Sequence, residues 1–125
     1  MLMYNGAMAR KHPLPTDALD LVAARFRVLG EPIRIRILEA LQSGEKSIGE
    51  LVDAVGSTQP NVSKHVRILY ESGLVGRRQA GTAVYCFVAD PAVFELCDAV
   101  CSSIETRLAA GAKLAAELKR GRPRY

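Results

Sequence analysis

Apolar side chains follow a helical period through the first half of this chain, and the period changes after Gly73. Residues three and four apart along an α-helix share a face, so apolar side chains at those spacings predict helices with one buried side. The third segment also begins with Ser47 and Glu50 at the spacing of a capping box, in which each side chain satisfies a backbone N–H of the other residue. The first three predicted helices cover residues 16–30, 32–43 and 47–56.

A fourth helix is predicted over residues 58–73, with Thr58 as its N-cap and Pro60 in the first turn, where a missing N–H removes no helical bond. Only Ser57 and Thr58 separate Gly56, which closes the third helix, from Gln59, so the pair predicts a helix-turn-helix. Its apolar residues share one side, and its polar residues are of the types that pair with base edges or phosphates. These polar residues are Gln59, Asn61, Ser63, Lys64 and Arg67. For an isolated helix, a solvated polar face would explain the same pattern.

After Gly73 two short segments rich in β-branched and aromatic residues predict a β-hairpin. They cover residues 75–79 and 83–88, and Arg77, Arg78, Gln79 and Thr82 lie near its tip. A last helix is predicted from Asp90 to about Lys119, with one apolar stripe along it. A helix of that length spans roughly 40 Å, more than a small core covers alone. A partner chain is therefore predicted.

Composition narrows the class of protein. The 125 residues suffice for one domain, and 49% hydrophobic with 24% charged residues is ordinary for a folded soluble protein. No apolar run is long enough to span a membrane, and the N-terminal region lacks the apolar stretch of an export signal, which predicts a cytoplasmic protein. The three cysteines are an odd number, which argues against a disulfide scaffold.

Net charge is +4 and the isoelectric point about 9.2, which permits nucleic-acid binding. Between residues 57 and 82 four basic residues face a single acidic one, so the excess coincides with the fourth helix and the hairpin. An enzyme is not predicted. The only histidines are His12 and His65, and no nucleophilic triad, phosphate-binding glycine loop or zinc-hydrolase spacing is present.

The element order and three phrases of the sequence resemble the ArsR/SmtB family of winged-helix repressors. The phrases are residues 29–38 (LGEPIRIRIL), 58–75 (TQPNVSKHVRILYESGLV) and 81–85 (GTAVY). The resemblance covers about residues 19–108. It implies a mainly α-helical fold with a small β-hairpin wing, a winged helix-turn-helix that is homodimeric through its terminal helices. It also implies double-stranded DNA with a palindromic operator as the partner, and no cofactor required for DNA binding.

Carried over by residue, the resemblance implies a reading helix that contacts DNA through Gln59, Asn61, Ser63, Lys64, His65 and Arg67. The wing would place Arg77, Arg78, Gln79 and Thr82 near phosphates or a minor groove. Two alternatives stay open. His65 is either a DNA contact or a histidine hydrogen-bonded within its own domain, and Arg67 and Arg78 can instead form surface ion pairs. The expected organisation is a flexible segment over 1–15, a DNA-binding and dimerisation domain over 16–119, and a basic tail over 120–125.

Many members of the family release DNA when an ion or a thiol modification shifts the dimer. One family metal site uses cysteines on the third helix, and this chain has none there. Another site uses ligands on the terminal helix. Asp90 matches the first of those ligands, but Ala92, Ser103 and Thr106 stand where the others would be. Thiol chemistry remains, through Cys86, Cys97 and Cys101. Three thiolates suit As(III) or Sb(III), the leading candidate inducer. Three alternatives stay open. The cysteines can be buried as small hydrophobic residues. The protein can instead be a redox or reactive-sulfur switch, or a helical interaction module that senses nothing.

Overall fold

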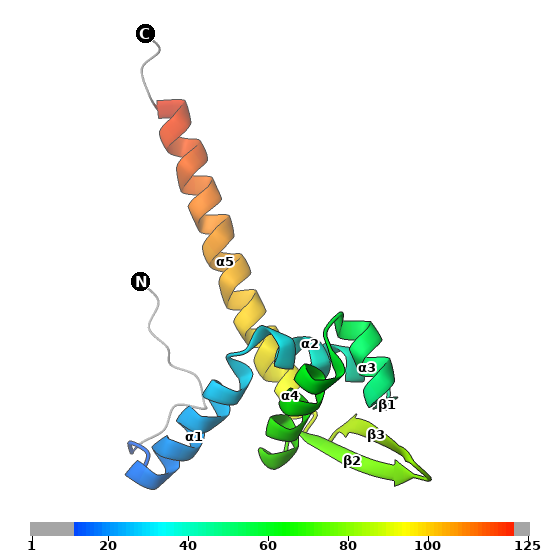
Figure 1. The fold of residues 1–125 in the computed structure, drawn as a ribbon. Helices are drawn as coiled ribbons and strands as arrows, with labels where there is room; N and C mark the ends of the chain where they lie inside the picture. The colour runs from blue at the N-terminus through cyan, green and yellow to red at the C-terminus, as the bar shows by residue number, and fades with distance from the viewer. Residues whose placement is uncertain (1–11, 122–125) are drawn as a thin grey trace. The chain divides into compact units, whose positions relative to one another are not determined.

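The described part of the structure has five helices and a small sheet, and the helices follow one another along the chain in the predicted order (Figure 1). The computed structural model describes residues 12–121. The first part of the chain holds the helices α1 (Thr16–Leu29), α2 (Pro32–Leu41), α3 (Ile48–Val55) and α4 (Gln59–Glu71). Their starts agree with the predicted ones to within a residue, because Pro and capping residues mark them in the sequence.

Local side-chain bonds define the helix-turn-helix. Ser47 Oγ accepts from the Glu50 N–H at 3.1 Å, and Glu50 Oε1 accepts from the Ser47 N–H at 3.1 Å, which confirms the capping box. These bonds lower the pKa of the Glu50 carboxyl below its ordinary value. Gly56 ends α3 in the left-handed region at φ 68°, which a residue with a Cβ adopts at a cost. This conformation lets the chain leave α3 and begin α4 after only three residues.

The wing is a three-stranded antiparallel sheet rather than a hairpin alone. Strands β2 (Val75–Ala80) and β3 (Ala83–Val88) pair along their whole length, and β1 (Lys46–Ser47) adds to the other side of β3. The strand order is β1-β3-β2. The sequence predicted only two strands, because a two-residue strand shows no alternation and its partner lies far along the chain.

The core lies where α2, α3 and α4 meet the base of the wing. Nine side chains there are essentially without solvent exposure: Ile37, Leu38, Leu51, Val62, Val66, Leu69, Leu74, Val75 and Cys86. Those of α4 are on the apolar side that the spacing predicted. Their burial removes apolar surface from water and holds α4 with its opposite face outward.

The chain divides into two compact units between Val88 and Ala89. The second unit contains α5 (Ala92–Gly121), a helix of 30 residues. The N–H of its first residue, Ala92, donates to Asp90 Oδ1 at 3.2 Å. The helix extends two residues past the predicted end at Lys119. Positions 101–121 of α5 are all exposed. Residues 1–11 and 122–125, where the flexible segment and the basic tail were predicted, lie outside the described residues.

Two helices expose apolar residues that the sequence pattern placed on buried faces. In α1 only Leu29 is buried, whereas Leu19, Val22 and Phe26 are 51%, 42% and 54% exposed. In α5 Val93 is buried, but Val100, Ile104 and Leu108 are 47%, 53% and 67% exposed. In each of the two helices, most of the predicted apolar stripe is therefore exposed.

Candidate nucleic-acid interface

Helix α4 presents one polar face to solvent. Thr58 Oγ1 accepts from the Asn61 N–H at 3.3 Å and caps the helix, and Pro60 lies in the first turn, as predicted. Val62, Val66 and Leu69 anchor the opposite face in the core at 0–2% exposure. The candidates that this arrangement leaves exposed are Gln59, Ser63, Lys64 and Arg67. A helix anchored along one side with its first turn free can enter a major groove.

Two other candidates on α4 are not equally available. Asn61 is half-buried, and its Nδ2 donates to Ser57 Oγ at 2.9 Å. His65 is only 7% exposed, and its Nδ1 accepts from Arg34 Nε at 3.0 Å. Of the two alternatives for His65, this geometry favours the histidine that is hydrogen-bonded within its own domain.

The wing candidates are all exposed, but each arginine is held by a neighbour. The Arg77 guanidinium carbon lies 3.8 Å from the centroid of the Tyr70 ring, so strand β2 contacts helix α4. Arg78 binds both carboxylate oxygens of Glu45, at 2.6 and 3.3 Å, and lies over the Tyr85 ring. Gln79 Nε2 donates to the Gly81 carbonyl at 3.4 Å, and Thr82 is exposed.

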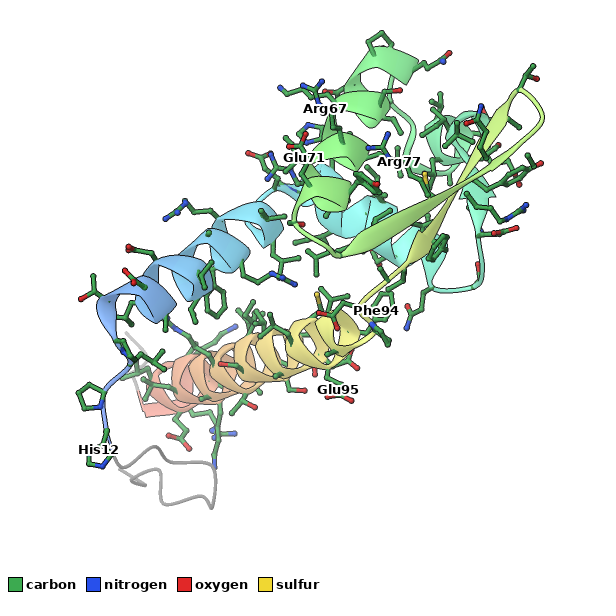
Figure 2. All side chains as sticks on the ribbon, turned by 90° about the horizontal axis from the view of Figure 1, so that it is seen from below. His12, Arg67, Glu71, Arg77, Phe94 and Glu95 are labelled. Atoms are coloured by element: carbon green, nitrogen blue, oxygen red, sulfur yellow. The ribbon has the colours of Figure 1, made fainter. Side chains whose placement is uncertain are left out.

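The surface ion pairs that were left open as alternatives for Arg67 and Arg78 are present. Arg67 Nε lies 3.9 Å from Glu71 Oε1. Figure 2 shows both residues on α4. The hydrogen bonds from Arg78 lower the pKa of the Glu45 carboxyl, and those to Glu45 raise the pKa of the Arg78 guanidinium. Both pairs are well exposed, so they orient the arginines more than they stabilise the fold.

The cysteines have three different environments. All are thiols: Cys86 is buried in β3, Cys97 is half-buried and Cys101 is exposed on α5. Burial raises the pKa of the Cys86 thiol, and the charge of Arg77 offsets part of that effect. Within residues 12–121 no three histidine, cysteine or acidic side chains form a group suited to hold a metal ion.

The sequence reasoning missed three residues of this surface. Glu45 meets Arg78 across 33 positions, Arg34 meets His65 across 31, and Tyr70 meets Arg77 only because β2 turns back along α4. No local pattern signals such contacts, since the first two depend on how distant segments pack and the third on how β2 folds back against α4. Over the described residues, no helix combines the length and apolarity that crossing a bilayer requires.

Comparisons with known proteins place this arrangement in a family. The model of the family described as "Bacterial regulatory protein, arsR family" matches residues 31–76, from α2 to the start of β2. A probable mercury resistance operon repressor of Streptomyces lividans is 35% identical over 83 residues, which are 66% of this chain and 66% of that protein. The chain spans 66%, 56% and 58% of the lengths of the first curated relatives that it matches.

Two solved structures share the fold. The crystal structure of Rv0081 of M. tuberculosis is 33% identical with a TM-score of 0.66, and the match covers 78% of this chain and 98% of that one. A homodimeric winged helix-turn-helix DNA-binding domain of Mycobacterium bovis is 29% identical with a TM-score of 0.65, covering 74% of this chain and 85% of that domain. The fold is thus a winged helix-turn-helix, and the relatives are regulators rather than enzymes. By both sequence and fold, the chain belongs to the ArsR family of bacterial regulatory proteins.

Proposed function

We propose that this protein is a cytoplasmic, homodimeric transcriptional repressor that reads a palindromic DNA operator through α4 and the wing. The observation that carries the proposal is the polar face of α4, on which Gln59, Ser63, Lys64 and Arg67 are exposed while the opposite face is anchored in the core. Gln pairs with adenine, Arg and Lys with guanine, and Ser with a base edge or a phosphate. We keep the half-buried Asn61 as a contact that requires its bond to Ser57 to open.

Wing residues Arg77, Arg78, Gln79 and Thr82 contribute phosphate or minor-groove contacts in this proposal. Such contacts set affinity more than sequence preference. Homodimer formation is supported by the exposed apolar residues of α1 and α5, because exposed apolar patches of this kind mark association surfaces. Two reading helices related by a two-fold axis require half-sites about one helical turn apart.

The test begins with selection of an operator from a random double-stranded DNA library by the wild-type protein. Binding should weaken steeply with salt, and Gln59→Ala or Ser63→Ala should relax sequence preference, with about 1–3 kcal/mol lost for each base contact. Gln42→Ala, an exposed glutamine at the end of α2, is the matched control and should leave the preference intact. If no sequence is enriched, or if specificity survives both α4 substitutions, the proposal fails and a protein-interaction module becomes the better account.

The inducer forms the second part of the proposal. We propose that As(III) or Sb(III) releases the operator by binding Cys86, Cys97 and Cys101, because a trivalent soft ion favours three sulfur ligands. The chemistry of the donors supports this, but the described residues gather no three-ligand group, so no coordination geometry follows. The raised pKa of the buried Cys86 works against its thiolate form.

A reactive-sulfur or redox switch is favoured by a different observation. Cys97 and Cys101 lie one turn apart on α5, and Cys101 is exposed to reagents while Cys86 is not. A direct disulfide between positions four apart on one helix is strained, so a longer sulfur bridge or a bond between chains is the product in this alternative.

Two variants separate these candidates. Cys101→Ser should leave operator affinity unchanged and abolish induction in either case, whereas Cys86→Ser should abolish only the response to arsenite or antimonite. Operator release is measured during titration with arsenite, antimonite and a persulfide donor, and the mass of the protein is recorded after each. Normal induction of the Cys101→Ser variant would refute both candidates.

A further inference from the structure

A part-buried polar contact joins the reading helix α4 to helix α2. His65 lies on the core side of α4, where 7% of its surface is exposed. Its Nδ1 accepts from Arg34 Nε of α2 at 3.0 Å, so the imidazole is neutral with its proton on Nε2. The same guanidinium uses Nη1 to donate to the Val28 carbonyl at the end of α1, at 3.1 Å. Arg34 therefore bridges α1 and α4.

A second arginine makes a parallel connection. Arg25 of α1 donates from Nη2 to the Ser72 carbonyl at 3.1 Å, and Ser72 is the C-cap of α4. A cation at this end also complements the partial negative charge of the helix terminus. Helix α1 is thus tied to the C-terminal end of the reading helix directly, and to its middle through Arg34.

Charges around His65 favour its neutral form. Burial lowers the pKa of His65 below the ordinary value of about 6.5, and the positive charges of Arg34 and Lys64 lower it further. Glu31, at the N-cap of α2, acts in the opposite direction. Arg34 and Glu31 act from the α2 side, and Lys64 acts from α4 itself.

We propose that Arg34 and Arg25 are positioning residues that hold the reading helix against α1, and that His65 must be unprotonated for the Arg34 connection to form. The proposal rests on the proposed function, because the readout is operator binding. Helix α1 also carries the exposed Leu19, Val22 and Phe26, which we assign to the dimer interface. The two arginines therefore connect the helix that carries these apolar residues to α4.

Protonation of His65 has an effect of definite sign. A proton on Nδ1 turns the acceptor into a donor and places an imidazolium beside a guanidinium, so the bond opens and α4 loses its connection to α1. Operator affinity should then fall as the pH is lowered. Protonation of an exposed side chain would instead raise operator affinity as the pH is lowered, because the added positive charge strengthens attraction to phosphates. The direction of the pH profile thus separates positioning from general electrostatics.

The experiment measures operator affinity of the full chain from pH 8.0 to 5.5 at constant salt. We expect wild-type affinity to drop by less than about tenfold over this range, because an imidazole whose pKa lies below 6.5 is only partly protonated at pH 5.5. His65→Asn keeps an acceptor near the position of Nδ1 but does not titrate, so its profile should be flat. His12→Asn removes the other histidine, which is exposed and appears in Figure 2, and should follow the wild type.

A measurement without DNA keeps the proposal testable if a variant fails to fold. Nitrogen NMR of the wild-type imidazole should show an unprotonated Nδ1 at pH 7, and its signal should shift in the Arg34→Lys variant. A protonated Nδ1 at pH 7, or a wild-type pH profile that is flat, rises on acidification, or persists in His65→Asn, would overturn the inference. Absence of any enriched operator would instead count against the proposed function, and the imidazole measurement would still decide this inference.

Discussion

Glu45 restrains one of the arginines that we propose for the wing contacts, so its removal should strengthen DNA binding. Arg78 has five N–H donors, and its Nε and Nη2 each bind one oxygen of Glu45 at 3.3 and 2.6 Å. In the Glu45→Gln variant this charge pairing is lost, and the guanidinium, still next to the Tyr85 ring, can bind a phosphate. The substitution also removes a negative charge from the surface that faces DNA in this proposal.

The expected magnitude follows from counterion release. One additional phosphate contact steepens the slope of log affinity against log salt by about 0.9, which corresponds to a several-fold gain at about 0.1 M salt. Fluorescence anisotropy with the selected operator at four or five salt concentrations measures both quantities. The double variant Glu45→Gln with Arg78→Gln should lose the gain, because the freed cation is then absent.

A matched substitution distinguishes this effect from a change in net charge. Glu39 pairs with Arg36 on α2 at 3.4 Å, and both side chains are well exposed. Glu39→Gln alters the net charge by the same amount but releases no arginine that we assign to DNA. Equal slopes for Glu39→Gln and Glu45→Gln, or no change of slope in Glu45→Gln, would refute the assignment of Arg78.

Four further outcomes are expected. Thr58→Ala removes the cap on α4 and should cost about 1 kcal/mol of unfolding free energy in urea; an unchanged midpoint would show that the cap contributes little. Leu69→Ala, at a position with no exposed surface, should cost about 2–5 kcal/mol in the same assay, and a loss below this range would mean that the core collapses around the gap. Tyr70→Leu should cost about 0.5–1 kcal/mol and shift the Arg77 side-chain NMR signals, whereas Tyr70→Phe should do neither, unless Arg77 is held by something other than the ring. At His65 the unfolded chain binds protons more readily than the folded protein, because folding lowers the pKa of this imidazole. The free energy of unfolding should therefore be highest above pH 6.5 and decline as the pH falls from there through the lowered pKa. Thermal unfolding of His65→Asn should lack this decline.

Much of the fold was predictable because its signals are local. Thr58 and Ser47 mark helix starts through bonds to residues three positions away, and Gly56 ends α3 in a conformation suited to glycine. The side of α4 that carries Val62, Val66 and Leu69 was predictable for the same reason, because helical spacing alone places them together. The candidate DNA-reading face follows as the side left over.

Contacts between distant segments were beyond that reasoning. β1 was missed because two residues carry no alternation, and its partner Cys86 lies some 40 positions away. From the sequence, His65 was either a DNA contact or a histidine hydrogen-bonded within its own domain. The second role is favoured only by the packing of α2 against α4, because it brings Arg34 within hydrogen-bond distance. By itself the sequence determined the helices, the β2–β3 hairpin of the wing and the chemical character of the candidate DNA-reading face. The tertiary structure decided which polar side chains remain available, because availability depends on neighbours that the chain brings together only when it folds.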